Sequence, residues 1–103
     1  MTRALFLTTH LSGSGHLTRT LALARAVAAA GGAARVLSGG RPLAHMPSDA
    51  ALTQLPPVAV QGLDFTRLLD PDGRPADAAR MAARAGAIAD AIEAGAPTVL
   101  VTK

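Results

Sequence analysis

Apolar residues in the first third of the chain follow two different patterns. Residues 3–9 form a short apolar run between polar residues, which predicts a parallel strand covered on both faces. Over residues 16–30 the apolar positions recur every three or four residues, which predicts a helix with one buried face. The positions on that face are Leu17, Leu21, Ala24 and Ala28, with Val27 at its side. Gly31 and Gly32 follow and end the predicted helix.

The rest of the chain predicts a second strand, an irregular segment, a second helix and a final strand. Residues 34–38 and 97–102 are the apolar runs of the two strands. Residues 41–75 are rich in proline and predict mainly turns, with a weak strand within 52–60. Residues 76–94 predict the second helix, with an aspartate in its first turn. The positions expected to be buried in this helix are Met81, Ala85, Ile88 and Ile92.

Strands that alternate with helices in this order predict an α/β domain with a parallel sheet. The expected fold is Rossmann-like, with helices flanking the sheet, and residues 1–103 form one domain. Open sheets of this kind bind ligands at the carboxyl ends of their strands. The sequence stops at such an end, so we expect an incomplete N-terminal part of a larger protein. Its exposed sheet edge would favour self-association.

Composition excludes several classes of function. The chain has no cysteine, which removes disulfides, thiolate metal sites and a cysteine nucleophile. Aromatic residues make up 2% of the chain, too few for the stacking platforms that bind single-stranded nucleic acid. Ten Lys and Arg residues stand against seven Asp and Glu, and the arginines are scattered along the chain. We therefore expect the arginines on solvated helix faces and no nucleic-acid partner.

Nothing in the sequence predicts a membrane span. The apolar stretches are all shorter than the roughly 18 residues that such a helix needs. The apolar run near the N-terminus is too short for the core of a signal peptide. The expected location is the cytoplasm, at the inner face of the membrane if the substrate is linked to a lipid.

The segment between the first strand and the first helix carries the strongest chemical signal. It contains Ser12, Gly13, Ser14, Gly15 and His16 in succession. Glycine lets a ligand approach the backbone closely, and the N-terminus of the following helix offers free N–H groups with a partial positive charge. This combination favours a site for a phosphate, diphosphate or carboxylate. A tight strand-to-helix turn with a serine cap is the alternative.

The familiar nucleotide motifs do not fit this segment. The dinucleotide fingerprint G-x-G-x-x-G needs a third glycine where the chain has Thr18. It also needs an acidic residue after the second strand, where Ser38, Gly39 and Gly40 stand. The phosphate loop G-x-x-x-x-G-K-[ST] lacks its lysine. A nicotinamide cofactor and nucleoside-triphosphate hydrolysis are therefore disfavoured, and we expect no cofactor.

Three further residues have a candidate role beside the glycines. A histidine can accept a proton from an alcohol near neutral pH, as a general base does. His16 is therefore the candidate base. The alternative is that its side chain bonds to the backbone at the start of the helix. His10 either lines the same cleft or points into solvent. Arg41 either holds an anionic group or is a solvated loop residue. His10, His16 and His45 lack carboxylate partners at ligand spacing, so we expect no metal site.

The run LFLTTHLSGSGHLTRTLALARAVAAAGGAARVLSGG resembles the start of the GT-B glycosyltransferases related to the N-acetylglucosaminyltransferase of peptidoglycan synthesis. It is similar also to a group of bacterial predicted glycosyltransferases. The family loop reads G-G-T-G-G-H, and the residues from Ser12 to His16 occupy the equivalent place. The resemblance is strong over residues 4–40 and weaker over 41–103.

The resemblance implies two Rossmann-like halves, of which the N-terminal half binds the sugar acceptor and the C-terminal half the nucleotide-sugar donor. It implies that Gly13 and Gly15 hold acceptor phosphate and that His16 deprotonates the acceptor hydroxyl. The donor half is absent from the sequence, and Lys103 stands where we expect an acidic residue in similar proteins. The expected function is thus the acceptor-binding half of a hexosyltransferase, inactive by itself. Its partners would be a sugar-acceptor small molecule or lipid-linked diphosphate, and a donor half in the same or a separate chain.

Two other functions stay open at this point. The chain could be a non-enzymatic module that binds an anion or docks a partner. It could also be part of a different enzyme on a nucleotide-binding fold, such as a nucleotide-sugar epimerase. Titration with nucleotide sugars separates this second alternative from a glycosyltransferase acceptor half, which binds them weakly or not at all.

Overall fold

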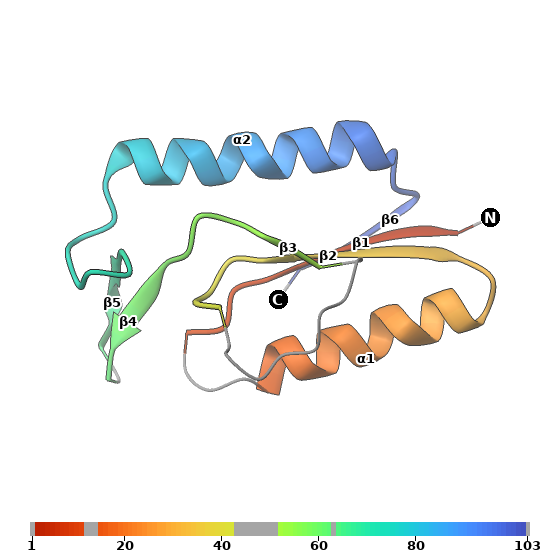
Figure 1. Ribbon diagram of the computed structural model, residues 1–103, viewed down its shortest axis with the longest axis horizontal. Helices are drawn as coiled ribbons and strands as arrows, with labels where there is room; N and C mark the ends of the chain where they lie inside the picture. The colour runs from red at the N-terminus through yellow and green to blue at the C-terminus, as the bar shows by residue number, and fades with distance from the viewer. Residues whose placement is uncertain (1, 12–14, 43–51, 63, 103) are drawn as a thin grey trace.

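The computed structural model describes residues 2–11, 15–42, 52–62 and 64–102. Its main sheet has four parallel strands in the order β3-β2-β1-β6. These strands are β1 (Arg3–Thr8), β2 (Ala33–Ser38), β3 (Leu52–Gln54) and β6 (Val99–Thr102). Helix α1 (Gly15–Ala29) covers one face of the sheet and helix α2 (Ala78–Gly95) lies over the other (Figure 1). The predicted α/β class and parallel sheet are confirmed, and the strand order is compatible with a Rossmann-like fold.

Helix α1 packs on the sheet through the face that its sequence pattern predicts. Leu17, Leu21 and Ala24 are buried against the side chains of β1 and β2 that point to the same side. Those strand residues are Ala4, Phe6 and Val36. Ala28, which we expected on this face, is exposed, whereas Thr20 is buried.

Helix α2 turns a different face to the sheet from the one its pattern predicts. Met81 and Ile92 are exposed, and so is Ala85; of the expected buried positions only Ile88 is partly buried. The residues that face the sheet are Arg84, Ala87, Ile88 and Ala91, which pack over Leu5, Leu37 and Leu55. The expected face was wrong because half of the positions of α2 are alanine, so its few large side chains decide the apparent period. The small alanines let α2 approach the leucines of the sheet. The Arg84 guanidinium donates hydrogen bonds to the carbonyl oxygens of Gly39 and Pro56, just past the ends of β2 and β3.

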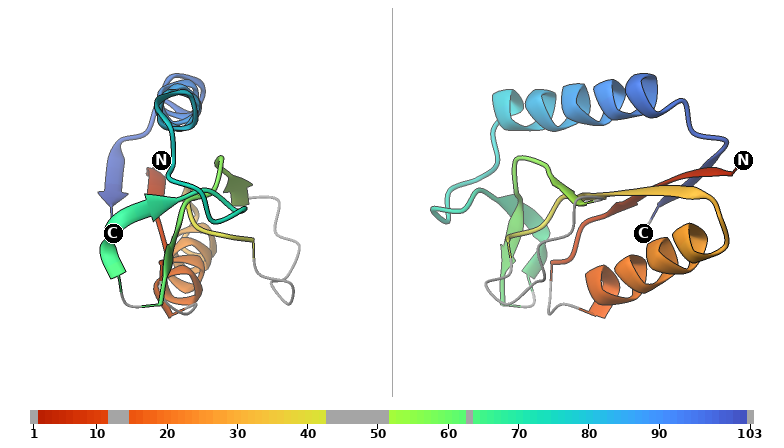
Figure 2. Two further views of the ribbon diagram at one scale, coloured as in Figure 1. Left: turned by 90° about the vertical axis from the view of Figure 1, so that its left-hand side faces the viewer. Right: turned by 45° about the vertical axis from the view of Figure 1, so that its right-hand side comes forward.

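The segment after β3 forms a second, two-stranded sheet that the sequence analysis missed in part. Strand β3 and the first two residues of β4 (Ala59–Gln61) fall within residues 52–60, where we predicted one weak strand, but β5 (Asp64–Leu69) lies where we expected turns. The two strands pair antiparallel beside the main sheet (Figure 2). At the start of β5 the Asp64 carboxylate accepts hydrogen bonds from the Thr66 hydroxyl and N–H, at 2.5 and 3.1 Å. These bonds favour the ionised carboxylate and lower the pKa of Asp64.

The two edges of the main sheet differ in character. Strand β3 is short and polar, and its Gln54 side chain donates to backbone carbonyls of its own sheet. Strand β6 is apolar along its length, and Val99 and Leu100 are exposed on its two faces. Among the described residues no strand pairs with the outer side of β6. Self-association through this edge stays a prediction.

Within the part of the chain that the structure describes, neither helix has the length and apolar character to cross a membrane.

Candidate functional site at the carboxyl ends of the strands

The parallel strands bring the candidate residues to one edge of the sheet. The carboxyl ends of β1, β2 and β3 lie at the same edge, and the N-terminus of α1 lies there too because α1 returns antiparallel to β1 (Figure 1). The loop after β1 carries Thr9 and His10, and the loop after β2 carries Gly39, Gly40 and Arg41. The candidate residues described at this edge therefore stand in the segments that directly follow β1 and β2.

His10 is buried between these two loops. Its side chain is 7% exposed, and its Nε2 lies 2.7 Å from the backbone oxygen of Arg41. A carbonyl oxygen only accepts hydrogen bonds, so Nε2 carries the proton. In the neutral ring Nδ1 is then an acceptor. The interpretation of His10 as a solvent-facing residue is wrong, because the ring joins the loop after β1 to the loop after β2.

Gly39 and Gly40 leave no space for a side chain. A Cβ on Gly39 would lie 2.5 Å from the Thr9 hydroxyl oxygen and 2.7 Å from a guanidinium nitrogen of Arg84. A Cβ on Gly40 would lie 2.7 Å from two atoms of the His10 ring and closer still to the His10 carbonyl oxygen. The glycine pair therefore permits close contact between the two loops.

Arg84 reaches the same place from α2. Its Nη1 donates to the carbonyl oxygens of Gly39, at 2.8 Å, and Pro56, at 2.6 Å, and its Nη2 lies 3.4 Å from the Thr9 hydroxyl oxygen. The side chain is 8% exposed, and burial, followed by the nearby charge of Arg80, lowers its pKa from the ordinary arginine value. The expectation that the arginines lie on solvated helix faces is wrong for Arg84. The backbone carbonyls at the strand ends supply the acceptors that make its burial possible.

Three buried polar atoms at this edge have no hydrogen-bond partner within the described structure. They are Thr8 Oγ1, Ser38 Oγ and His10 Nδ1. Thr8 and Ser38 are partners in the register of β1 and β2, so their Cα atoms lie side by side at the strand ends. Side chains alternate along a strand, so these two hydroxyls lie on the same face as Phe6 and Val36, toward α1. Buried polar groups are normally satisfied, and two neighbouring exceptions indicate a site for a polar ligand or water.

The remaining candidate residues are placed as follows. Gly15 and His16 are the first two residues of α1, and the His16 side chain is exposed. The backbone carbonyl oxygen of His16 accepts a hydrogen bond of 2.7 Å from the Thr20 hydroxyl. Arg41 is exposed and lines an open hollow of about 410 Å³ beside the β4–β5 hairpin. Ser12, Gly13, Ser14 and His45 lie outside the described residues. Within the described ranges no three His, Asp or Glu residues gather as metal ligands would.

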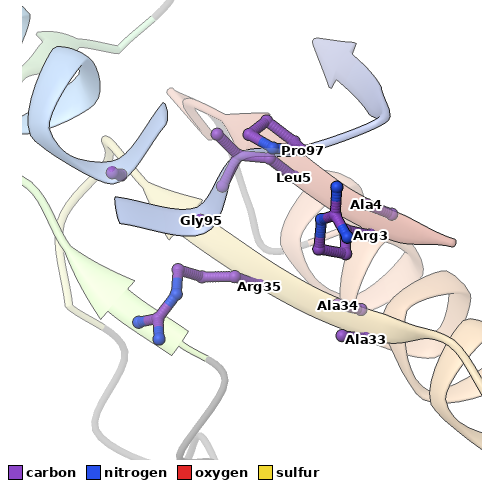
Figure 3. Close-up of a pocket in the computed structure, with 9 residues that line it drawn as sticks. Arg3, Ala4, Leu5, Ala33, Ala34, Arg35, Gly95 and Pro97 are labelled. Atoms are coloured by element: carbon purple, nitrogen blue, oxygen red, sulfur yellow. The ribbon is translucent and has the colours of Figure 1, made fainter. Parts of the chain in front are cut away.

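A second cavity lies at the opposite end of the sheet. It has a volume of about 190 Å³ and lies between the C-terminal end of α2 and the first residues of β1 and β2 (Figure 3). Arg3 and Arg35 line it together with alanines, and Arg3 Nε donates to the Ala96 carbonyl oxygen just past α2. These arginines interact with the end of α2 and with Thr53 of β3, and the cavity contains no acid, base or nucleophile.

Sequence reasoning found this edge of the sheet but missed the residues that organise it. Thr8 and Ser38 appeared only as strand residues, and Arg84 as one arginine among many. No signal in the sequence of α2 sets Arg84 apart, because the helix also carries the charged residues Arg80, Asp90 and Glu93.

The fold and the site together define a class of protein. It is an α/β protein with a parallel sheet, and buried polar side chains lie at the carboxyl ends of its strands. No protein-family model, curated protein or solved structure matches the chain. The resemblance to GT-B glycosyltransferases therefore stays a prediction.

Proposed function

We propose that the carboxyl edge of the sheet binds the phosphate or diphosphate group of a sugar acceptor, and that the chain is the acceptor-binding half of a Rossmann-like GT-B glycosyltransferase. The observation that carries the proposal is the pair of buried, unpartnered hydroxyls of Thr8 and Ser38 on the α1 side of the sheet. A phosphate oxygen there would accept from both hydroxyls and from the free N–H groups of the first turn of α1.

The exposed position of His16 supports its role as the base. His16 is the second residue of α1, its side chain is exposed, and the N-terminus of α1 lies at the same end of the sheet as Thr8 and Ser38 (Figure 1). His16 would take the proton of the acceptor hydroxyl while that oxygen forms a bond to the anomeric carbon of the donor sugar. The bond from that carbon to the nucleoside diphosphate breaks, and the leaving group departs with the electron pair. A donor-binding half, in the same or another chain, would supply the nucleotide sugar, so this half alone is inactive.

Titration of the isolated chain with inorganic diphosphate and with UDP-N-acetylglucosamine tests the proposal. We expect amide NMR signals of Gly15 and His16 to shift on addition of diphosphate, and the nucleotide sugar to bind no more tightly than diphosphate itself. Nucleotide-sugar binding that is much tighter would favour the epimerase-like alternative. If neither compound shifts these signals, the proposed anion site is refuted.

Substitution of Thr8 by valine separates a ligand-binding hydroxyl from a structural one. Because its hydroxyl is buried without a partner, we expect Thr8→Val to raise the free energy of unfolding by about 1 kcal/mol while it weakens diphosphate binding. Thr20→Val is the matched control, since the buried Thr20 hydroxyl bonds to the His16 carbonyl oxygen. That variant should lose about 0.5–1 kcal/mol.

Urea unfolding of both variants measures the two free energies. If Thr8→Val is destabilised as much as Thr20→Val, the Thr8 hydroxyl already has a partner, such as a buried water, and is not free for a ligand.

A further inference from the structure

Arg84 is the one buried guanidinium within the described residues, and it contacts all three strand-end loops. Its hydrogen bonds join α2 to Gly39 after β2 and to Pro56 after β3, and it lies near Thr9 after β1. The contacts span 45, 28 and 75 residues of sequence, and they add to backbone bonds that join the same segments, such as Gly39 N–H to the Thr8 carbonyl oxygen at 2.8 Å and Val58 N–H to the Gly39 carbonyl oxygen at 3.1 Å.

Among the described residues no acidic side chain pairs with the charge of Arg84. Its acceptors there are carbonyl and hydroxyl oxygens, and the charged neighbour that affects its pKa is another cation, Arg80. A buried charge without an opposite partner is costly unless it is well hydrogen-bonded. The carbonyl dipoles offset part of that cost.

Arg84 also controls the surroundings of His10. Arg84 bonds to the carbonyl oxygen of Gly39. The next residue, Gly40, lies so close to the His10 ring that a Cβ there would be 2.7 Å from two ring atoms. Arg84 approaches Thr9, which precedes His10. The His10 ring in turn bonds to Arg41. Each loop that borders the proposed phosphate site is therefore linked to Arg84 directly or through one neighbour.

We propose that Arg84 is the positioning residue of the anion site: it sets the spacing of the loops after β1 and β2, and so the placement of His10, and adds a positive charge beneath the bound anion. The inference rests on the proposed function for the identity of the anion, a phosphate or diphosphate. The positioning of the loops is a property of the ligand-free protein.

Arg84→Lys tests the proposal because lysine keeps the charge but has a single nitrogen in place of the planar guanidinium, whose Nη1 bonds two carbonyls while its Nη2 approaches the Thr9 hydroxyl. We expect inorganic diphosphate to bind this variant about tenfold more weakly, which corresponds to the loss of one to two hydrogen bonds. We also expect the ring nitrogen and carbon NMR signals of His10 to shift in the absence of ligand. Arg80→Met is the matched control, since Arg80 lies one turn earlier and donates at 3.1 Å to a single carbonyl, that of Pro57.

The two variants distinguish an effect of Arg84 on loop position from an effect of net charge or of protein stability on diphosphate binding. Arg80→Met should leave the His10 signals in place and change the diphosphate affinity by no more than about twofold. The proposal is overturned if Arg84→Lys folds with unshifted His10 signals, or if Arg80→Met weakens binding as much as Arg84→Lys. If Arg84→Lys does not fold, Arg84→Gln, which keeps donor groups on a shorter neutral side chain, takes its place. If the wild-type chain binds no diphosphate, the proposed function fails, and the His10 signals alone decide whether Arg84 positions the loops.

Discussion

Replacement of Gly40 by alanine is expected to lower the free energy of unfolding by about 1–3 kcal/mol. A Cβ at this position overlaps the His10 ring at 2.7 Å and the backbone of the same residue, so one of the two strand-end loops must move. The bond between His10 Nε2 and the Arg41 carbonyl oxygen spans the same two loops and would lengthen or break. Urea unfolding measures the loss of stability, and the His10 ring signals report the loop displacement.

Gly86→Ala is the control for this substitution. Gly86 lies inside α2, and a Cβ there meets no atom within 4 Å. Alanine favours the helix over glycine by about 0.5–1 kcal/mol, so this variant should be stabilised. Opposite signs for the two glycine substitutions would support the packing of the strand-end loops. Equal, small effects would mean that Gly40 is not in close contact with His10.

Replacement of Leu17 by alanine is expected to cost about 2–5 kcal/mol, the range for a large buried aliphatic side chain. Leu17 is 2% exposed and packs in the core between α1 and the sheet, next to the first turn of the helix. Because it holds the start of α1 against β1, the loss should also weaken diphosphate binding at that start. A chain of this size buries a limited core, so the variant could unfold completely at ambient temperature.

Leu23→Ala provides the comparison on the same helix. Leu23 is 46% exposed, so its replacement should change the free energy of unfolding by less than about 0.5 kcal/mol. Thermal or urea unfolding of the two variants measures the difference. A similar loss for both leucines would show that α1 does not pack through the face that contains Leu17.

The two helices illustrate how far a sequence pattern predicts packing. In α1 the leucines and the more polar residues alternate clearly, so the predicted and observed faces agree at Leu17, Leu21 and Ala24. In α2 alanine occupies half of the positions, and the few larger residues do not mark the buried face. Arg84 occupies a buried position there because acceptors from three distant loops meet it. Such acceptors leave no trace in the sequence of the helix itself.

The sequence by itself determined the α/β class, the parallel strands and the edge of the sheet at which chemistry is expected, because these follow from the local order of apolar runs, helical periods and glycines. Only the tertiary structure decided that His10 is buried between two loops, that Thr8 and Ser38 present unpartnered hydroxyls, and that Arg84 links the strand ends. Those features depend on which distant backbone oxygens and side chains meet in space. Residues tens of positions apart make these contacts, and the pattern along one segment does not contain them.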